Sequence, residues 1–380
     1  MKIAFFLGST SYASGLYNAT TDTAAAIRKM GHEVDYVFLE QSEALRESDK
    51  IVDIWGLSKK TRSSRVFIKL MKTLFGYHFF HALFSMLFSA KLETFLQKHD
   101  YDLVFFHGTN FLPFSAYSAP SYVVVHSCKY VNLVGRRRGI KKYFYHKLYQ
   151  KIYSSKHLLC VSDSAKEDML TLIKAKPQSI ETIYNGFDFE KMKALAQQPC
   201  ALELPEKFIM SAGRPDRTKR FDVLLRAFSE SSSRETHDLV IFGEGRGLPE
   251  LQRLAKELGI DHRVRFLGFY SPLNAVYQHA SLYVLSSDIE GLPTVIVESI
   301  VAGTPVVSTD AGGARELLAN GSADYVCEKG NHRELAKLID RALEEDKPVS
   351  AEMLSFLQSD KVALHYISCA ERQARNARYD

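Results

Sequence analysis

The sequence predicts an α/β protein made of two doubly wound domains, each with a parallel sheet covered by helices. Three observations indicate this fold class. Short, nearly continuous apolar runs alternate with helical patterns along most of the chain, as in a parallel sheet buried on both faces. A polar, proline-containing stretch at 197–207 interrupts this alternation, which then starts again. The chain has 380 residues, more than one hydrophobic core usually organises.

The first half begins with a strand over 3–8. A helix over 18–30 follows, and Gly31 ends it because left-handed backbone geometry costs glycine little. After a strand at 33–39, the section from about 55 to 98 is long, helical, basic and aromatic, which indicates an insertion. Further strands are expected at 103–107, 122–126, 157–162 and 179–184.

The second half repeats the pattern. Lys219 opens an amphipathic helix, and a second helix runs from Pro293 to about Ala302. We therefore expect an N-terminal domain over 1–198, rejoined by a C-terminal helix at 360–380, and a C-terminal domain over 204–358. The strands of the second domain are expected at 208–213, 238–243, 263–268, 282–287 and 305–309.

Composition narrows the class of protein. The five cysteines form no CxxC pair, so neither a zinc site nor a disulfide framework is indicated, and a reducing cytoplasm fits best. The apolar start ends after about six residues, which is short for a signal peptide. The apolar stretch at 79–90 is too short to span a bilayer. We expect a cytoplasmic protein that at most contacts a membrane surface.

Charge is distributed unevenly. The net charge is +5, but 17 Lys or Arg and only three acidic residues lie between Ile54 and Ser162, so this part carries +14 and the remainder −9. Such asymmetry indicates that the basic part meets something anionic, such as a phosphorylated substrate, a membrane or nucleic acid. We do not expect nucleic acid, because no recognised binding module is present.

The stretch EGLPTVIVE (290–298) places one glutamate on each side of an apolar run. A strand ends just before it and a helix begins inside it, so the amides of Gly291–Val295 form an anion site suited to phosphate. Glu290 precedes the helix and Glu298 lies about one turn into it, where carboxylates can accept hydroxyl groups. The pattern indicates a hydroxyl-rich phosphate ester. The alternative is a solvated Glu290 and a Glu298 that caps first-turn amides.

A second motif, GRPDRTKRFDVLLRAF (213–228), follows the strand at 208–213. Ligands of open parallel sheets bind beyond the carboxyl ends of the strands, which is where Arg214 and Lys219 are expected. Two cations at a strand-to-helix junction can neutralise a diphosphate leaving group. An exposed basic loop remains the alternative for Arg217 and Arg220.

These motifs, with AGTPVVSTDAGGARE (302–316), together resemble the retaining glycosyltransferases of family 4, which have the GT-B fold. YNGFD (184–188), VSDSAKEDM (161–169) and YVVVHS (122–127) match that family in order and spacing. The resemblance implies two Rossmann-like domains facing across a cleft. It also implies sugar transfer from a nucleotide-diphosphate sugar, with retention at the anomeric carbon and no catalytic metal.

The resemblance also implies roles for individual residues. Arg214 and Lys219 look like the pair that binds the donor diphosphate, Glu298 like the residue that holds the ribose, and Glu290 like the one near the donor sugar. His126, at a strand end, matches the histidine near the reacting carbon, although a lone strand-end histidine is more often structural. Expected further donor contacts come from Gly15, Gly243, Gly291, Leu292, Pro293 and Thr294. Members commonly carry Gly-Gly after the first strand, whereas this chain has Ser14 before Gly15.

Two motifs are set aside. Asp100-Tyr101-Asp102 spells the DxD of metal-dependent glycosyltransferases, but it precedes the strand at 103–107 and so lies at the wrong edge of the sheet. GEGRG (243–247) lacks the GxGxxG spacing of a dinucleotide fingerprint. We expect no cofactor besides the nucleotide-sugar substrate.

The basic part is expected to hold the acceptor. GRRRGIKKYFYHK (135–147) and the basic, apolar stretch at 65–84 indicate contact with an anionic bilayer or a phosphorylated glycolipid, while solvated helix faces are the alternative. By analogy this fits a lipopolysaccharide-core or surface-polysaccharide enzyme at the cytoplasmic face of the inner membrane. A sugar-nucleotide epimerase and a non-catalytic nucleotide-sugar-binding protein remain alternatives. The sequence leaves open the sugar, UDP against GDP, the acceptor, the linkage and the oligomeric state.

Overall fold

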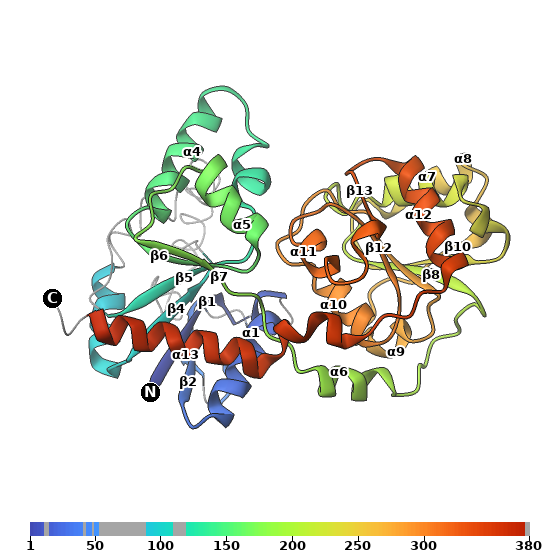
Figure 1. Ribbon diagram of the computed structural model, residues 1–380. Helices are drawn as coiled ribbons and strands as arrows, with labels where there is room; N and C mark the ends of the chain where they lie inside the picture. The colour runs from blue at the N-terminus through green and yellow to red at the C-terminus, as the bar shows by residue number, and fades with distance from the viewer. Residues whose placement is uncertain (11–14, 41–42, 48, 53–88, 109–118, 377–380) are drawn as a thin grey trace. The chain divides into compact units, whose positions relative to one another are not determined.

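The structure is a computed structural model that describes residues 1–10, 15–40, 43–47, 49–52, 89–108 and 119–376 (Figure 1). The chain forms two compact units. Unit 1 holds Met1–Phe187 and Leu357–Asp380, and unit 2 holds Asp188–Phe356. Each unit is built on one parallel α/β sheet, which confirms the predicted fold class.

The sheet of unit 1 has seven strands in the order β3-β2-β1-β4-β5-β6-β7. Every pair of neighbouring strands is parallel. The order reverses between β1 and β4, so the loops after these two strands diverge at the carboxyl edge. The strands are β1 (Lys2–Ser9), β2 (Glu33–Glu40), β3 (Lys50–Ile51), β4 (Leu103–His107), β5 (Ser121–Val125), β6 (His157–Cys160) and β7 (Ser179–Thr182).

Helices cover both faces of this sheet because successive strand residues point to opposite sides. Phe6 and Phe106 belong to one core with the buried residues of α4, whereas Phe5 and Phe105 pack against Tyr366 of α13. Helices α1 and α13 lie side by side in Figure 1. The helices are α1 (Gly15–Lys29), α4 (Gly139–Tyr153), α5 (Asp163–Glu167) and α13 (Ser359–Asn376), with π-helical turns at Tyr130–Val134 and Asp168–Leu172 and helical residues at 89–99.

The sheet of unit 2 has six strands in the order β10-β9-β8-β11-β12-β13, again all parallel. From β8 the chain passes to β9 and β10 on one side and then returns to β11 on the other. The order therefore reverses between β8 and β11. The strands are β8 (Phe208–Ala212), β9 (Asp238–Phe242), β10 (Val264–Phe266), β11 (Leu282–Leu285), β12 (Val306–Thr309) and β13 (Val326–Cys327).

One face of the second sheet packs against α7, α8 and α12 in a single apolar core. Leu224 and Phe228, on the apolar side predicted for α7, are completely buried there. Helices α9 and α10 contact each other and α6. The helices are α6 (Phe189–Ala196), α7 (Phe221–Glu230), α8 (Leu248–Glu257), α9 (Asn274–Tyr277), α10 (Thr294–Val301), α11 (Ala314–Leu318) and α12 (His332–Glu345), with 3₁₀ turns at Ser232–Glu235, Asp261–Arg263, Ala323–Tyr325 and Ala351–Leu357.

The structure differs from the sequence expectations at several positions. Helix α7 begins at Phe221 and not at Lys219, because the backbone of Arg220 is left-handed, with φ +49°. The chain passes between units after Phe187, about ten residues before the expected end of the first domain, because α6 packs on α9 and α10 of unit 2. The two-residue strands β3 and β13 were not predicted, since so short a run has no readable periodicity. Most of the expected insertion at 55–98 lies outside the described residues.

Candidate functional site

Two loops of unit 2 meet where its strand order reverses. The first, 213–220, follows β8, and the second, 286–293, follows β11. Both lie at the carboxyl edge of the sheet, beside the position where a doubly wound sheet receives its ligand. The predicted residues Arg214, Lys219 and Glu290 lie on these two loops.

Hydrogen bonds join the two loops directly. The amide of Asp288 donates to the carbonyl of Thr218 at 2.8 Å, and the Ser286 hydroxyl donates to the carbonyl of Lys219 at 2.8 Å. Arg220 adds a guanidinium fork, with Nη1 2.9 Å from Asp288 Oδ2 and with Nε and Nη2 each 3.0 Å from an Asp222 oxygen. Arg220 is thus a structural tether between the two loops and not the exposed loop residue that the sequence alternative described.

Lys219 and Glu290 form an ion pair across the loops. Lys219 Nζ lies 2.8 Å from Glu290 Oε1, and the side chains are 22% and 14% exposed. Both groups are therefore largely removed from water while each stays within reach of the loop surface. The pair brings together two residues that sequence reasoning placed in one site from positions 71 residues apart.

Arg214 is exposed at the start of the first loop. Among the residues that the structure describes, no carboxylate pairs with its guanidinium. The backbone of Gly213 lies so close to Gly243 that only glycine fits there. The φ of Gly243 is +139°, and an added Cβ would lie 1.9 Å from the carbonyl oxygen of Gly213. Glycine at 243 is thus required by packing beneath the first loop, and its contact with a ligand stays a prediction.

The turn after β12 packs against the loop before α10 and supports it. An added Cβ at Gly312, where φ is +57°, would lie 2.3 Å from the carbonyl oxygen of Glu290. The amide of Gly313 donates to the carbonyl of Gly291 at 2.9 Å. Helix α10 starts at Thr294 after Pro293, with no side chain capping it and no acidic residue in its first turn. Its first amides remain suited to an anion.

Glu298 lies inside α10 and contacts the buried helix α9. The hydroxyl of Tyr277, which is completely buried, donates to Glu298 Oε2 at 3.0 Å. The side chain of Glu298 keeps some exposed surface, yet its dense surroundings raise the pKa of the carboxyl, while hydrogen bonds from Tyr277 and Thr294 oppose that rise. Sequence reasoning missed Tyr277, because nothing local marks a core tyrosine as a partner of a carboxylate.

The remaining predicted residues belong to unit 1. Gly15 is the first residue of α1, and His126 directly follows β5 rather than ending it. His126 Nε2 lies 3.0 Å from Nδ1 of His107, the last residue of β4. Burial, and then the cation of Lys129, lower the pKa of His126 to about 3. Sequence reasoning missed His107. Its position at the end of a predicted strand, at the same edge of the sheet as His126, could have indicated that the two histidines meet.

The motifs set aside from sequence have structural explanations. Asp102 Oδ2 accepts the amide of Lys2 at 2.6 Å at the amino edge of the sheet, away from the strand ends that receive ligands. Within the described ranges, no group of three or more His, Cys, Asp or Glu side chains is arranged to hold a metal ion. Metal-independent chemistry itself stays a prediction.

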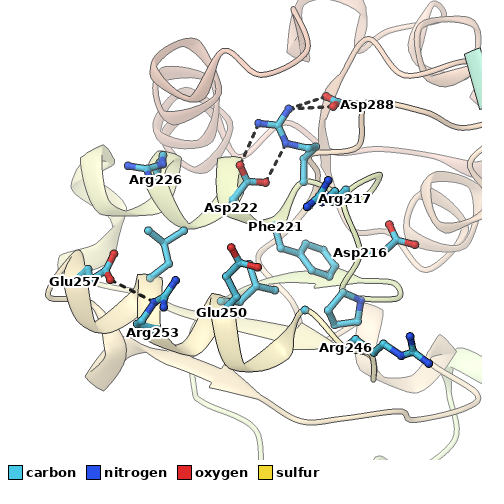
Figure 2. A pocket seen from close by; sticks show the side chains of 15 residues that line it. Asp216, Arg217, Phe221, Asp222, Arg226, Arg246, Glu250, Arg253, Glu257 and Asp288 are labelled. Carbon is cyan, nitrogen blue, oxygen red and sulfur yellow. Dashed lines mark hydrogen bonds and ion pairs between the residues drawn. The ribbon is translucent and has the colours of Figure 1, made fainter. Parts of the chain in front are cut away.

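A hollow of about 830 Å³ lies between α7 and α8 (Figure 2). Five arginines and five acidic residues line it, among them Arg217, Arg220 and Asp288 from the two loops. None of the predicted ligand residues Arg214, Lys219, Glu290 or Glu298 lines it. The hollow is therefore not the site assembled at the strand reversal.

Helix α4 carries an unusual exposed surface. Ile140, Tyr143 and Phe144 are 72%, 58% and 51% exposed among basic residues of the same helix. The other basic and apolar stretch expected to contact a membrane, 65–84, lies outside the described residues. In the part of the chain that the structure describes, no helix has the length and apolar character needed to cross a bilayer.

Two protein-family models match the chain, one in each half. Residues 13–191 match the model described as Glycosyltransferase Family 4, and residues 195–354 match the one described as Glycosyl transferases group 1. Together the two matches span most of the chain.

Individual proteins also resemble the chain. A relative in Campylobacter jejuni is 27% identical over 252 residues, 65% of this chain and 68% of the relative, and is named N-acetylgalactosamine-N,N'-diacetylbacillosaminyl-diphospho-undecaprenol 4-alpha-N-acetylgalactosaminyltransferase. The structure of Anabaena Alr3699/HepE in complex with UDP aligns with a TM-score of 0.65 and 19% identity over all of both chains. WaaG, a glycosyltransferase involved in lipopolysaccharide biosynthesis, aligns at 0.65 and 16% over 98% of each. Both solved structures share the fold of this chain.

Proposed function

The chain belongs to the glycosyltransferases that its two family matches describe, and from that premise we propose its reaction. It moves a sugar from a nucleotide-diphosphate sugar, with UDP as the first choice of nucleotide, to a hydroxyl group of a glycan or glycolipid. The sugar keeps its anomeric configuration, and no metal ion takes part.

The ion pair at the strand reversal carries this proposal. Lys219 and Glu290 are 2.8 Å apart and largely withdrawn from water, so each neutralises the other until a ligand arrives. A donor with a diphosphate and a hydroxylated sugar offers a partner to both, phosphate oxygens to Lys219 and hydroxyl groups to Glu290. The exposed guanidinium of Arg214 is placed on the same loop for a second phosphate contact.

In the proposed chemistry, the site stabilises the negative charge that develops on the leaving diphosphate. The bond between the anomeric carbon and the diphosphate breaks, and its electron pair goes to the phosphate oxygen. Fixed cations and helix amides stabilise that developing charge better than water can, because they are already oriented. The acceptor oxygen attacks the same face, and its proton passes to the leaving phosphate. Glu298 would hold the ribose, and Gly15, Gly243 and Gly291–Thr294 would line the donor. His126 would lie near the reacting carbon.

The acceptor proposal rests on helix α4. Its exposed Ile140, Tyr143 and Phe144 among lysines form the combination that binds anionic bilayers, with apolar groups in the interface and cations at the headgroups. A membrane-bound, anionic glycolipid of lipopolysaccharide or surface-polysaccharide biosynthesis fits this surface. The names of the Campylobacter relative and of WaaG, which concern a diphospho-undecaprenol glycan and lipopolysaccharide, support the same class of acceptor.

Nucleotide binding is the first test. Thermal unfolding of the full chain is measured with UDP, GDP, ADP and CMP, in EDTA and then with Mg²⁺. A nucleotide at about 100 times its dissociation constant stabilises by roughly 2.7 kcal/mol. We expect UDP to give a shift that does not need Mg²⁺ and that Glu298→Ala removes.

Four other results would redirect the proposal. A shift that appears only with Mg²⁺ contradicts metal independence, and a shift with GDP alone replaces the donor. If no nucleotide changes the unfolding temperature, the site itself is misassigned. Turnover of the donor to an epimeric nucleotide-sugar in the absence of any acceptor would identify an epimerase instead.

A further inference from the structure

Two histidines meet at the carboxyl edge of the unit 1 sheet, and the proposed function uses only one of them. His107 ends β4, and His126 directly follows the neighbouring strand β5. Nδ1 of His107 and Nε2 of His126 are 3.0 Å apart, which is one hydrogen bond. Because the strand order reverses between β1 and β4, the pair lies beside the place where this sheet would receive a ligand.

His107 is enclosed by aromatic rings. It is 2% exposed, its ring centroid lies 4.8 Å from that of Phe5, and it is nearly parallel to Tyr366 at 6.5 Å. Its Nε2 is buried and has no hydrogen-bond partner among the described residues. Within the described part of the chain, the bond to His126 is therefore the only polar contact that offsets the cost of burying this ring. A phenylalanine would fill a similar space without that cost.

The environment keeps both rings neutral. Burial lowers the pKa of His107 well below its usual range, and His126 adds to the effect. A neutral imidazole has one N–H donor and one acceptor nitrogen, so the shared bond requires one ring to donate and the other to accept. Nε2 of His107 is buried with no acceptor among the described residues, and a buried N–H without a partner is rare because it is costly. The proton of His107 therefore belongs on Nδ1, which donates to Nε2 of His126 and leaves the proton of His126 on Nδ1.

We propose that His107 is a positioning residue that selects one neutral tautomer of His126 and leaves Nδ1 as its only ring nitrogen open to a substrate. The 3.0 Å contact and the enclosure of His107 carry this inference. It rests on the proposed function, in which His126 lies near the reacting carbon. In that position His126 acts as an oriented hydrogen-bonding group and not as a charged acid.

Three variants of His107 separate positioning from packing. His107→Asn keeps an amide nitrogen near the place of Nδ1, His107→Gln moves its amide toward the place of Nε2, and His107→Leu keeps bulk without a polar group. The tautomer of His126 is read by ¹⁵N NMR of histidine-labelled full-length protein, with the resonance assigned by its loss in His126→Asn. We expect one tautomer in the unaltered chain and in His107→Asn, and a mixture in His107→Leu and His107→Gln.

Turnover supplies the second measurement. UDP release from UDP-glucose, UDP-galactose and UDP-N-acetylgalactosamine, with water as acceptor, gives kcat and KM for each variant. His107→Leu and His107→Gln should lower kcat by tenfold or more with KM for the donor little changed, because orientation is lost while the donor is held by unit 2. His107→Asn should recover most of that loss. If either His107→Leu or His107→Gln does not fold, the other variant still tests the loss of positioning.

The outcomes separate this inference from the proposed function. An unchanged tautomer and kcat in His107→Leu and His107→Gln overturn the positioning role, whether or not UDP binds. A mixture of tautomers in the unaltered chain overturns it too. If the unaltered chain neither binds UDP nor releases it from any donor, the proposed function is wrong, and the tautomer of His126 still decides whether the pair is fixed.

Discussion

At the scale of single residues, the candidate site is a set of charged side chains that neighbouring residues hold in position. Arg220 fixes the loop that carries Lys219, and Gly312 lets the next turn support the carbonyl of Glu290. Tyr277 does the same for Glu298 from inside the core. These neighbours fix the positions of the charged groups, and the Tyr277 hydroxyl also opposes the rise in the pKa of Glu298.

Tyr277→Phe tests this arrangement through pH. The proposed ribose contact needs an ionised Glu298, so nucleotide binding is complete above the pKa of that carboxyl and is lost as pH falls through it. Burial already raises this pKa, and the Tyr277 hydroxyl opposes the rise. Losing a hydrogen bond to a charged group costs about 1.5–3 kcal/mol, so we expect the acid limb of UDP binding to move up by roughly 1–2 pH units.

The measurement is the dissociation constant of UDP by calorimetry between pH 4.5 and 8. The matched control is 2′,3′-dideoxy-UDP, whose weaker binding should respond to pH equally in both proteins because it offers Glu298 no hydroxyl. Identical pH profiles of UDP binding in the two proteins would contradict the role given to Tyr277.

At the scale of elements, helix α4 has one side in the core of unit 1 and another side exposed to solvent. Tyr145, Leu148, Tyr149 and Ile152 bury one side of it in the core of unit 1, while Ile140, Tyr143 and Phe144 lie in water. Large apolar residues gathered on an exposed surface usually mark an interaction site. The lysines among them favour an anionic surface as the partner.

Charge reversal on α4 tests that partner. We expect the full chain to sediment with vesicles that contain phosphatidylglycerol and not with pure phosphatidylcholine. Each cation near an anionic surface contributes about 1 kcal/mol, so Lys141→Glu with Lys151→Glu should weaken binding at least tenfold, and added salt should weaken the unaltered chain.

Lys256→Glu on the exposed side of α8 is the matched control and should leave vesicle binding unchanged. Equal binding by the α4 variant, or equal binding to neutral vesicles, would argue that the exposed side of α4 is merely solvated.

At the scale of the whole molecule, the chain leaves unit 1, builds unit 2 and returns. Residues from Leu357 onward belong to unit 1, where α13 packs along α1. Tyr366 on α13 is 4% exposed and contacts Phe5 and Phe105 with ring centroids 5.7 Å and 4.7 Å away. The last helix of the sequence thus completes the core that the first strand began.

Tyr366→Ala should therefore weaken unit 1 alone. Truncating a large buried aromatic residue costs about 3–5 kcal/mol, so we expect calorimetry to resolve a lowered transition for unit 1, while UDP still raises the transition of unit 2. Leu364→Ala, at a residue of the same helix that is 58% exposed, is the control and should change stability by no more than about 0.5 kcal/mol. Loss of the UDP effect in Tyr366→Ala would show that the units do not bind and unfold independently.

Much of the molecule could be predicted from the sequence by itself. Local patterning determined the type and order of most elements, because a buried strand must be apolar along its length and a helix must be apolar on one side. The strand β4 was predicted with its observed bounds, and the stretch 290–298 was correctly divided into loop and helix. Arg214, Lys219 and Glu290 stood out because they follow strand ends, and Glu298 stood out because a carboxylate in an apolar helix has no use in packing.

Only the tertiary structure decided which residues are partners. Lys219 meets Glu290, His107 meets His126 and Tyr277 meets Glu298 because parallel strands align their carboxyl ends or because two helices pack together. Such contacts join positions far apart in the chain, and no local pattern encodes them. The assignment of α6 to unit 2 and of α13 to unit 1 has the same cause. Apolar surfaces pack together when their shapes are complementary, whatever their order in the sequence.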